Sequence, residues 1–217
     1  MQTLVQKLID QGLENRVLTE KQLARILEGS PQRRYGLVNR ALNAGELHRL
    51  SRGRYVLADR FRDYPNHPFA LAQAFVQGSY ISFETALAYH GWIPEAVYTT
   101  SSATPGRKTL TFDSGKFGHY SFHPLAVNTG QFLVLVQRIL ITQQTMLVAE
   151  PLRAMMDLVC LRKTKWQGLE WLLEGLRIDE EFLRSIKPSD MNALMLVYKQ
   201  KRVRSFLNSL ARALGHD

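Results

Sequence analysis

The sequence predicts an α+β protein with a basic, mainly helical part over residues 1–62 and a mixed α/β part over residues 67–217. Three observations predict this organisation. Positive charge is concentrated in the first part, which also carries three helical repeats of apolar residues followed by two short strands. The second part alternates strand and helix patterns, so we expect an antiparallel sheet there, followed by C-terminal helices. A chain of 217 residues is long enough for two modest domains with these boundaries.

The charge of the chain points to a polyanionic partner. The formal net charge is +9, and residues 1–62 hold twelve Lys or Arg against six Asp or Glu, which is +6 of that excess. Such a field attracts nucleic acid or anionic membrane. No apolar run approaches the roughly 20 residues that span a bilayer. The N-terminus has no secretory pattern, so we expect a cytoplasmic protein. The single cysteine, Cys160, is expected to be a buried structural thiol.

The first part is predicted to form three helices. Apolar residues over 4–9 repeat at helical spacing and predict the first helix. Thr19 is placed to cap the second, and Pro31 fits the first position of the third. The inward face of the third helix is apolar and consists of Leu37, Val38, Ala41 and Leu42.

The other side of the third helix is rich in side chains that read DNA bases. Arg pairs with guanine O6 and N7, and Asn or Gln pairs with adenine N6 and N7 in the major groove. The candidate DNA-binding residues on this helix are Gln32, Arg33, Arg34, Tyr35, Asn39 and Arg40.

Residues 47–57 are predicted to form a hairpin in which Gly53 supplies the tight turn. Basic residues around this turn are expected to lie along the DNA backbone or to enter the minor groove. They are Arg49, Arg52 and Arg54. Three helices and a basic hairpin together predict a winged helix-turn-helix that binds double-stranded DNA and needs nothing downstream to fold.

The second part begins after residues 60–68, whose two prolines are typical of a linker. Ser82 is placed to cap a helix. Helices are expected over 69–76, over 83–90 and after Pro151, and strands over 96–101, 108–112, 118–122, 132–136 and 138–141. The basic tail over 190–214 has helical spacing and is either a second DNA-contacting face or a solvated helix surface.

No catalytic residue, metal site or cofactor is expected, and the protein is not predicted to be an enzyme. No Cys/His set has zinc spacing, and His119 and His123 are not expected to share a face of their strand. Asp113 and Lys116 are the only loose nuclease-like pair and are better explained as a solvated hairpin tip. Two alternatives stay open: a protein-interaction module with an incidental basic surface, and a metal-dependent nuclease of unrecognised type.

Three stretches resemble the AbiEi-type antitoxins of bacterial type IV toxin–antitoxin systems. They are the hairpin end Gly53-Arg54-Tyr55-Val56-Leu57, residues 80–98 (YISFETALAYHGWIPEAVY) and residues 148–157 (VAEPLRAMMD). The resemblance implies an autorepressor whose winged helix binds a repeat-containing operator in its own promoter. It also implies a second domain with an antitoxin role against a nucleotidyltransferase-like toxin, which need not be contacted directly. Oligomeric state is left open.

Overall fold

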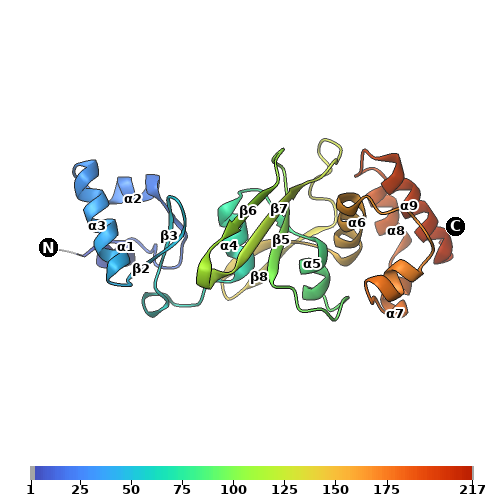
Figure 1. Cartoon of the computed structure of the whole chain (residues 1–217), viewed down its shortest axis with the longest axis horizontal. Helices are drawn as coiled ribbons and strands as arrows, with labels where there is room; N and C mark the ends of the chain where they lie inside the picture. The colour runs from blue at the N-terminus through green and yellow to red at the C-terminus, as the bar shows by residue number, and fades with distance from the viewer. Residues whose placement is uncertain (1–2, 217) are drawn as a thin grey trace.

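The computed structural model describes residues 3–216 and shows an α+β protein with a three-stranded and a six-stranded sheet. The molecule is elongated, with the N-terminal helices at one end, the larger sheet in the middle and the C-terminal helices at the other end (Figure 1). We refer to residues 3–62 as the head and to residues 67–216 as the body. Within residues 3–216 no helix is long and apolar enough to cross a membrane.

Local signals in the sequence determine the helices of the head. They are α1 (Leu4–Asp10), α2 (Glu20–Ile26) and α3 (Pro31–Asn43). The Thr19 side chain accepts a hydrogen bond from the Gln22 backbone N–H, and the Gln22 side chain accepts one from the Thr19 N–H. This reciprocal cap satisfies two N–H groups that have no partner inside the helix. The prediction that Thr19 caps this helix is therefore confirmed.

The small sheet of the head is antiparallel, in the order β1-β3-β2. Its strands are β1 (Leu18–Thr19), β2 (Leu47–Ser51) and β3 (Arg54–Leu57). The turn between β2 and β3 contains Gly53 at φ 73°. Glycine adopts this left-handed conformation without steric cost, as the sequence predicts.

This small sheet contributes to two hydrophobic cores. Leu47, Tyr55 and Leu57 belong to the core of the head with the helices α1, α2 and α3. Leu50 and Val56, which are 2% and 0% exposed, belong instead to the core of the body. The sequence predicts a head that folds without the body, whereas this shared hairpin, which packs into both cores, predicts that the two parts depend on each other.

Polar and aromatic contacts cross the same junction. The Ser114 hydroxyl donates a hydrogen bond to the Leu50 carbonyl at 2.5 Å. The His48 ring meets the Phe117 ring edge-on, with 5.9 Å between centroids. Burial, and then the nearby Lys116, lower the pKa of His48, so the ring is neutral at pH 7.

The segment with linker composition is held in place. After a short 3₁₀ turn, η1 (Asp59–Phe61), the Arg62 guanidinium donates to the carbonyls of Glu14 and Asn15 at 3.0 and 3.1 Å. Asn15 in turn contacts Asp63 through both its side-chain nitrogen and its side-chain oxygen. Residues 60–63 are therefore fixed against the head and are not a free tether.

The larger sheet has the order β6-β7-β5-β4-β9-β8 and is mixed, so the prediction of an antiparallel sheet is wrong. Parallel pairs form between β5 and β7 and between β4 and β9. The chain reaches the outer edge with β6 and returns through β7, which lies between β6 and β5 and runs in the direction of β5. Alternation along a sequence predicts a strand but not its neighbour. The strands are β4 (Tyr80–Ile81), β5 (Thr99–Thr104), β6 (Leu110–Asp113), β7 (His119–Pro124), β8 (Val136–Ile141) and β9 (Gln144–Ala149).

Strand β9 is absent from the sequence prediction, which places two strands over 132–136 and 138–141. In the structure residues 132–135 form a turn and β8 is followed at once by β9. The connecting Thr142 and Gln143 both have positive φ, 43° and 60°. Hairpin turns of this type are usually signalled by Asn-Gly or Asp-Gly, so Thr-Gln gives no such signal.

Helices cover both faces of the larger sheet. Tyr120 and His123, three residues apart in β7, point to opposite faces. Phe75 packs on the Tyr120 ring, and Phe83 meets the His123 ring edge-on. The helix that carries Phe75 therefore covers one face and the helix that carries Phe83 covers the other. The helices of the body are α4 (Pro68–Phe75), α5 (Phe83–Tyr89), α6 (Pro151–Arg162), η3 (Trp171–Gly175), α7 (Glu180–Arg184), α8 (Pro188–Met195) and α9 (Lys201–Ala213), with a short η2 (Gly115–Phe117).

Candidate nucleic-acid interface

The polar side of α3 is open to solvent. Gln32, Arg33 and Arg40 are exposed, and the Tyr35 side chain is 69% exposed although its ring is apolar. Ala41 is buried, and the other inward residues Leu37, Val38 and Leu42 pack against the core of the head. The helix therefore buries its apolar face and presents long polar side chains on the other, as the sequence predicts.

Two arginines gather at the turn that precedes α3. Arg34, half-buried, donates from Nη1 to the Gly29 carbonyl at 2.8 Å. A Cβ placed at Gly29 would lie 3.0 Å from Cδ of Arg33, so the Arg33 side chain covers this glycine. Both guanidinium groups therefore lie near the N-terminus of α3, where free backbone N–H groups and the helix dipole also favour an anion.

Glycine occupies the middle of the exposed side of α3. Gly36 follows Gln32 by four residues and precedes Asn39 by three, so it shares their face of the helix. Within residues 3–216 no atom lies within 4 Å of a Cβ placed there, apart from the neighbours in its own helix. Glycine in a helix costs about 1 kcal/mol relative to alanine, and packing in this chain gives no reason for it.

The hairpin contributes two exposed arginines. Arg49 and Arg52 are both exposed, and the Arg49 guanidinium lies over the Tyr55 ring at 5.8 Å from its centroid. Tyr55 also lines a small groove between α2 and α3 together with Tyr35. Arg49 and the exposed side of α3 therefore lie on neighbouring surfaces of the head.

Arg54 differs from the sequence prediction. Its side chain is half-buried and donates to the carbonyls of Ala74 and Phe75, at 3.2 and 3.1 Å, at the end of α4. These are carbonyls that the helix itself leaves without a partner. Arg54 thus joins the head to the body, and its guanidinium is already used by these two carbonyls.

The basic tail helix lies away from this surface. α9 is at the opposite end of the molecule from α3 (Figure 1). The Arg202 guanidinium donates to the Val159 and Thr164 carbonyls, at 3.0 and 2.6 Å, and so caps the end of α6. The most central arginine of the tail therefore has a structural role in the body.

No group of three or more His, Cys, Asp or Glu in the described part of the chain could hold a metal ion. Asp113 is exposed and pairs with His119 at 3.6 Å. The expectation that His119 and His123 face opposite ways is wrong, since residues four apart in a strand share a face. They stand about 13 Å apart along β7, too far to share one ion.

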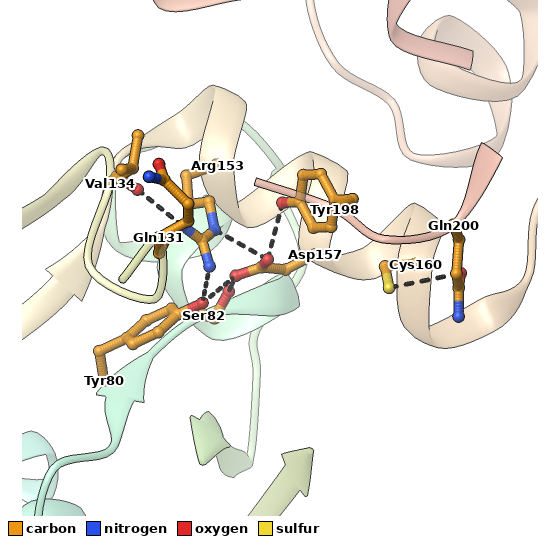
Figure 2. A network of polar contacts seen from close by, with 9 residues as sticks. All are labelled: Tyr80, Ser82, Gln131, Val134, Arg153, Asp157, Cys160, Tyr198 and Gln200. Atoms are coloured by element: carbon orange, nitrogen blue, oxygen red, sulfur yellow. Dashed lines mark hydrogen bonds and ion pairs between the residues drawn. The ribbon is translucent and has the colours of Figure 1, made fainter. Parts of the chain in front are cut away.

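The most deeply buried charges form a structural network (Figure 2). Arg153 and Asp157, both 0% exposed, pair at 2.9 Å within α6. Asp157 also accepts hydrogen bonds from the hydroxyls of Tyr80 and Tyr198, each at 2.8 Å. Ser82 stands at the cap position of α5, but its hydroxyl donates to Asp157 at 2.7 Å and accepts no hydrogen bond from the first turn of the helix, so the predicted side-chain cap is wrong.

The protonation states in this network are fixed by its surroundings. Burial, and then the Asp157 carboxylate, raise the pKa of both tyrosines well above the usual value, so each keeps its proton and donates. Burial opposes the charge of Arg153, but Asp157 together with Tyr198 and Tyr80 outweighs it and raises the arginine pKa. These contacts use both carboxylate oxygens of Asp157 and give it a structural role. Cys160, at the end of α6, is buried as predicted, and burial raises its thiol pKa.

No protein-family model matches the sequence. The resemblance to AbiEi-type antitoxins thus stays a prediction from the three stretches that carry it, since no curated protein matches the chain either.

Proposed function

We propose that the chain is a sequence-specific DNA-binding repressor whose head is a winged helix-turn-helix. In this proposal α3 lies in the major groove and the β2–β3 turn lies beside the backbone. The observation that carries it is the polar side of α3, where the exposed Gln32, Tyr35 and Arg40 and the half-buried Asn39 surround a glycine that packing does not require.

The order of elements in the head supports the proposal. Helix, strand, helix, helix and a two-stranded hairpin follow one another, with the early strand β1 paired to β3. This is the order found in winged helix-turn-helix proteins, whose second helix of the pair reads base edges. The charge also fits, because two-thirds of the positive excess lies in this part of the sequence.

The alternatives fit the chain less well. A protein-interaction module with an incidental basic surface gives no reason for a glycine that packing does not require, between Gln32 and Arg40 on a helix rich in base-reading side chains. A metal-dependent nuclease needs convergent carboxylates. Among residues 3–216 no group of three or more His, Cys, Asp or Glu could hold a metal ion.

Asn39→Ala is the direct test of base reading. We expect weaker binding to DNA from upstream of the protein's own gene by about 1–3 kcal/mol, because an asparagine that pairs with adenine discriminates by that amount. Binding to random duplex of the same length should change little. Fluorescence anisotropy at fixed salt with both duplexes measures the difference. Equal losses on both would make Asn39 a backbone contact, and no loss on either would remove α3 from the interface.

Arg52→Ala tests the hairpin. Removing one phosphate contact is expected to reduce the slope of log K against log salt by about one, on any sequence. Arg54→Ala is the matched contrast two residues away, since its guanidinium is already used by carbonyls of α4. It should leave the slope unchanged while lowering stability. An unchanged slope in Arg52→Ala would place the hairpin outside the DNA interface.

Gly36→Ala separates folding from binding. Alanine should raise the free energy of unfolding by up to about 1 kcal/mol, because it is the better helix former and meets no neighbour. The added methyl should also weaken operator binding if DNA approaches the helix closely at this point. Urea unfolding and anisotropy on the same preparation measure both effects. A variant that is more stable and binds operator as well as the original protein would contradict close approach at Gly36.

We further propose, from the sequence resemblance, that the protein is the antitoxin of a type IV toxin–antitoxin system and represses its own promoter. The functional partner would be a nucleotidyltransferase-like toxin encoded beside it. Growth rescue during expression of the neighbouring gene tests this role. Comparing the original protein with Asn39→Ala in that assay separates rescue through repression from rescue that does not need DNA binding.

A further inference from the structure

A cavity of about 510 Å³ opens on the body beside the start of β5. Its volume falls in the range of roughly 300–1,000 Å³ that is usual for small-molecule sites. The wall combines the first turn of α5, the loop before β5, the last residue of α6 and the end of η3. Its lining includes Glu84, Ile93, Glu95, Tyr98, Ser101 and Arg162.

Two ion pairs give the cavity an ordered distribution of charge. Arg162 donates to Glu84, and Arg177, which follows the lining residue Leu176, donates from Nε to Glu95 at 2.7 Å. In each pair the carboxylate is the less exposed partner. Side-chain exposure is 30% for Glu84 against 49% for Arg162, and 42% for Glu95 against 60% for Arg177. Both carboxylates and Arg162 therefore line the cavity, and Arg177 lies beside it.

The position of Glu84 depends on an unusual backbone. Phe83, the residue before it, has φ 57° and is fully buried. A bulky side chain rarely adopts positive φ, and such a conformation persists only where the surroundings enforce it. Here the Phe83 ring is enclosed in the core and meets the His123 ring edge-on. The turn from β4 into α5 is thereby fixed, with Glu84 at the wall of the cavity.

Apart from the hydroxyl residues Thr99 and Ser101, the rest of the lining is apolar or aromatic. Ile93, Val97 and Leu176 line the cavity, and Tyr98 is 88% exposed at its mouth. Within residues 3–216 Glu84 is the side chain that Arg162 contacts. A guanidinium carries five N–H donors, so several remain for an anion.

From this arrangement we propose that the cavity binds a free α-amino acid with an apolar or aromatic side chain. Its ammonium group would meet the Glu84 and Glu95 carboxylates, its carboxylate would meet the free donors of Arg162, and its side chain would lie against Ile93, Val97 and Tyr98. The electrically balanced pairs suit a ligand that carries both charges better than a simple cation or anion. This site is separate from the proposed DNA-binding function, and its test uses no DNA.

The test is calorimetric titration of the full-length protein with each apolar and aromatic proteinogenic amino acid in turn. At least one should bind at a 1:1 ratio with a Kd below about 1 mM. Its N-acetyl and carboxamide derivatives, which each lack one charge, should bind at least about 10-fold more weakly. If none of the amino acids binds, or if both derivatives bind as well as the parent, the proposal is wrong.

Variants then locate the binding. Glu84→Gln should weaken it about 10- to 100-fold, because the ammonium group loses a charged acceptor and meets only the neutral carbonyl oxygen of Gln. Glu180→Gln is the matched control, since it breaks the exposed pair with Arg184 in α7. Tyr98→Ala provides a second test at a side chain too exposed to support the fold, and should also weaken binding. Unchanged affinity in both Glu84→Gln and Tyr98→Ala would place the ligand elsewhere and overturn the proposal.

Discussion

Asp157→Ala is expected to lower the free energy of unfolding by about 3–5 kcal/mol, enough to remove a large share of the stability of an ordinary domain. The change leaves Arg153 charged and fully buried without its carboxylate, and it removes the acceptor of three hydroxyl groups. Urea unfolding followed by circular dichroism measures the loss.

The control is an ion pair of the same chemistry on the surface. Glu180→Ala removes the partner of Arg184 at the same i, i+4 spacing, but both side chains are more than half exposed. Its cost should be small, since water takes the place of the carboxylate. A double change of Arg153 and Asp157 to Met and Leu should recover part of the loss by removing the uncompensated charge. Similar small costs for Asp157→Ala and Glu180→Ala would contradict the structural role of the network.

A fragment that ends at Tyr64 is expected to lose cooperative folding. Cutting there exposes Leu50 and Val56, which are buried in the core of the body, at about 1.5–3 kcal/mol each. It also removes the two carbonyls that hold Arg54. A core of this size rarely supplies more than about 3–5 kcal/mol, so little stability should remain. Thermal unfolding by circular dichroism and dispersion of amide resonances report on the fragment.

The matched experiment makes the same cut without removing the body. A protease site inserted after Tyr64 should yield two pieces that stay together through the shared hairpin and still unfold cooperatively. In the isolated fragment, Leu50→Thr together with Val56→Thr should improve solubility by making the newly exposed surface polar. A sharp unfolding transition in the unmodified fragment, with DNA binding retained, would show that the head is independent after all.

The sequence predicts those parts of the fold that depend on neighbouring residues. The reciprocal cap of Thr19 and Gln22, Pro31 at the start of α3 and Gly53 in the hairpin are local signals, and each is found where expected. The turn of Thr142 and Gln143 is local too, but its residues are not those that usually adopt positive φ, so the sequence does not predict β9.

Features that join distant residues could not be predicted in this way. The hydrogen bond from Tyr80 to Asp157 joins residues that are 77 positions apart in the sequence. The hydrogen bonds from Arg54 join it to carbonyls 20 and 21 positions away. An arginine at a hairpin turn has the same local sequence whether it meets a phosphate or a helix end. The sequence therefore predicts the candidate site as a set of exposed polar residues, and only the structure distinguishes Arg52 from Arg54.

The shared hairpin has a geometric consequence for an operator with repeats. In the proposed function, the packing of this hairpin into both cores would keep the body in one orientation relative to DNA bound by α3. Two molecules on neighbouring repeats would each bring a body along a fixed direction, rotated with the duplex by one turn per roughly 10 base pairs. Two neighbouring repeats could be bound at the same time only if the distance between them keeps the two bodies from colliding. In this protein the permitted distance between repeats would thus be determined by residues that never approach a base.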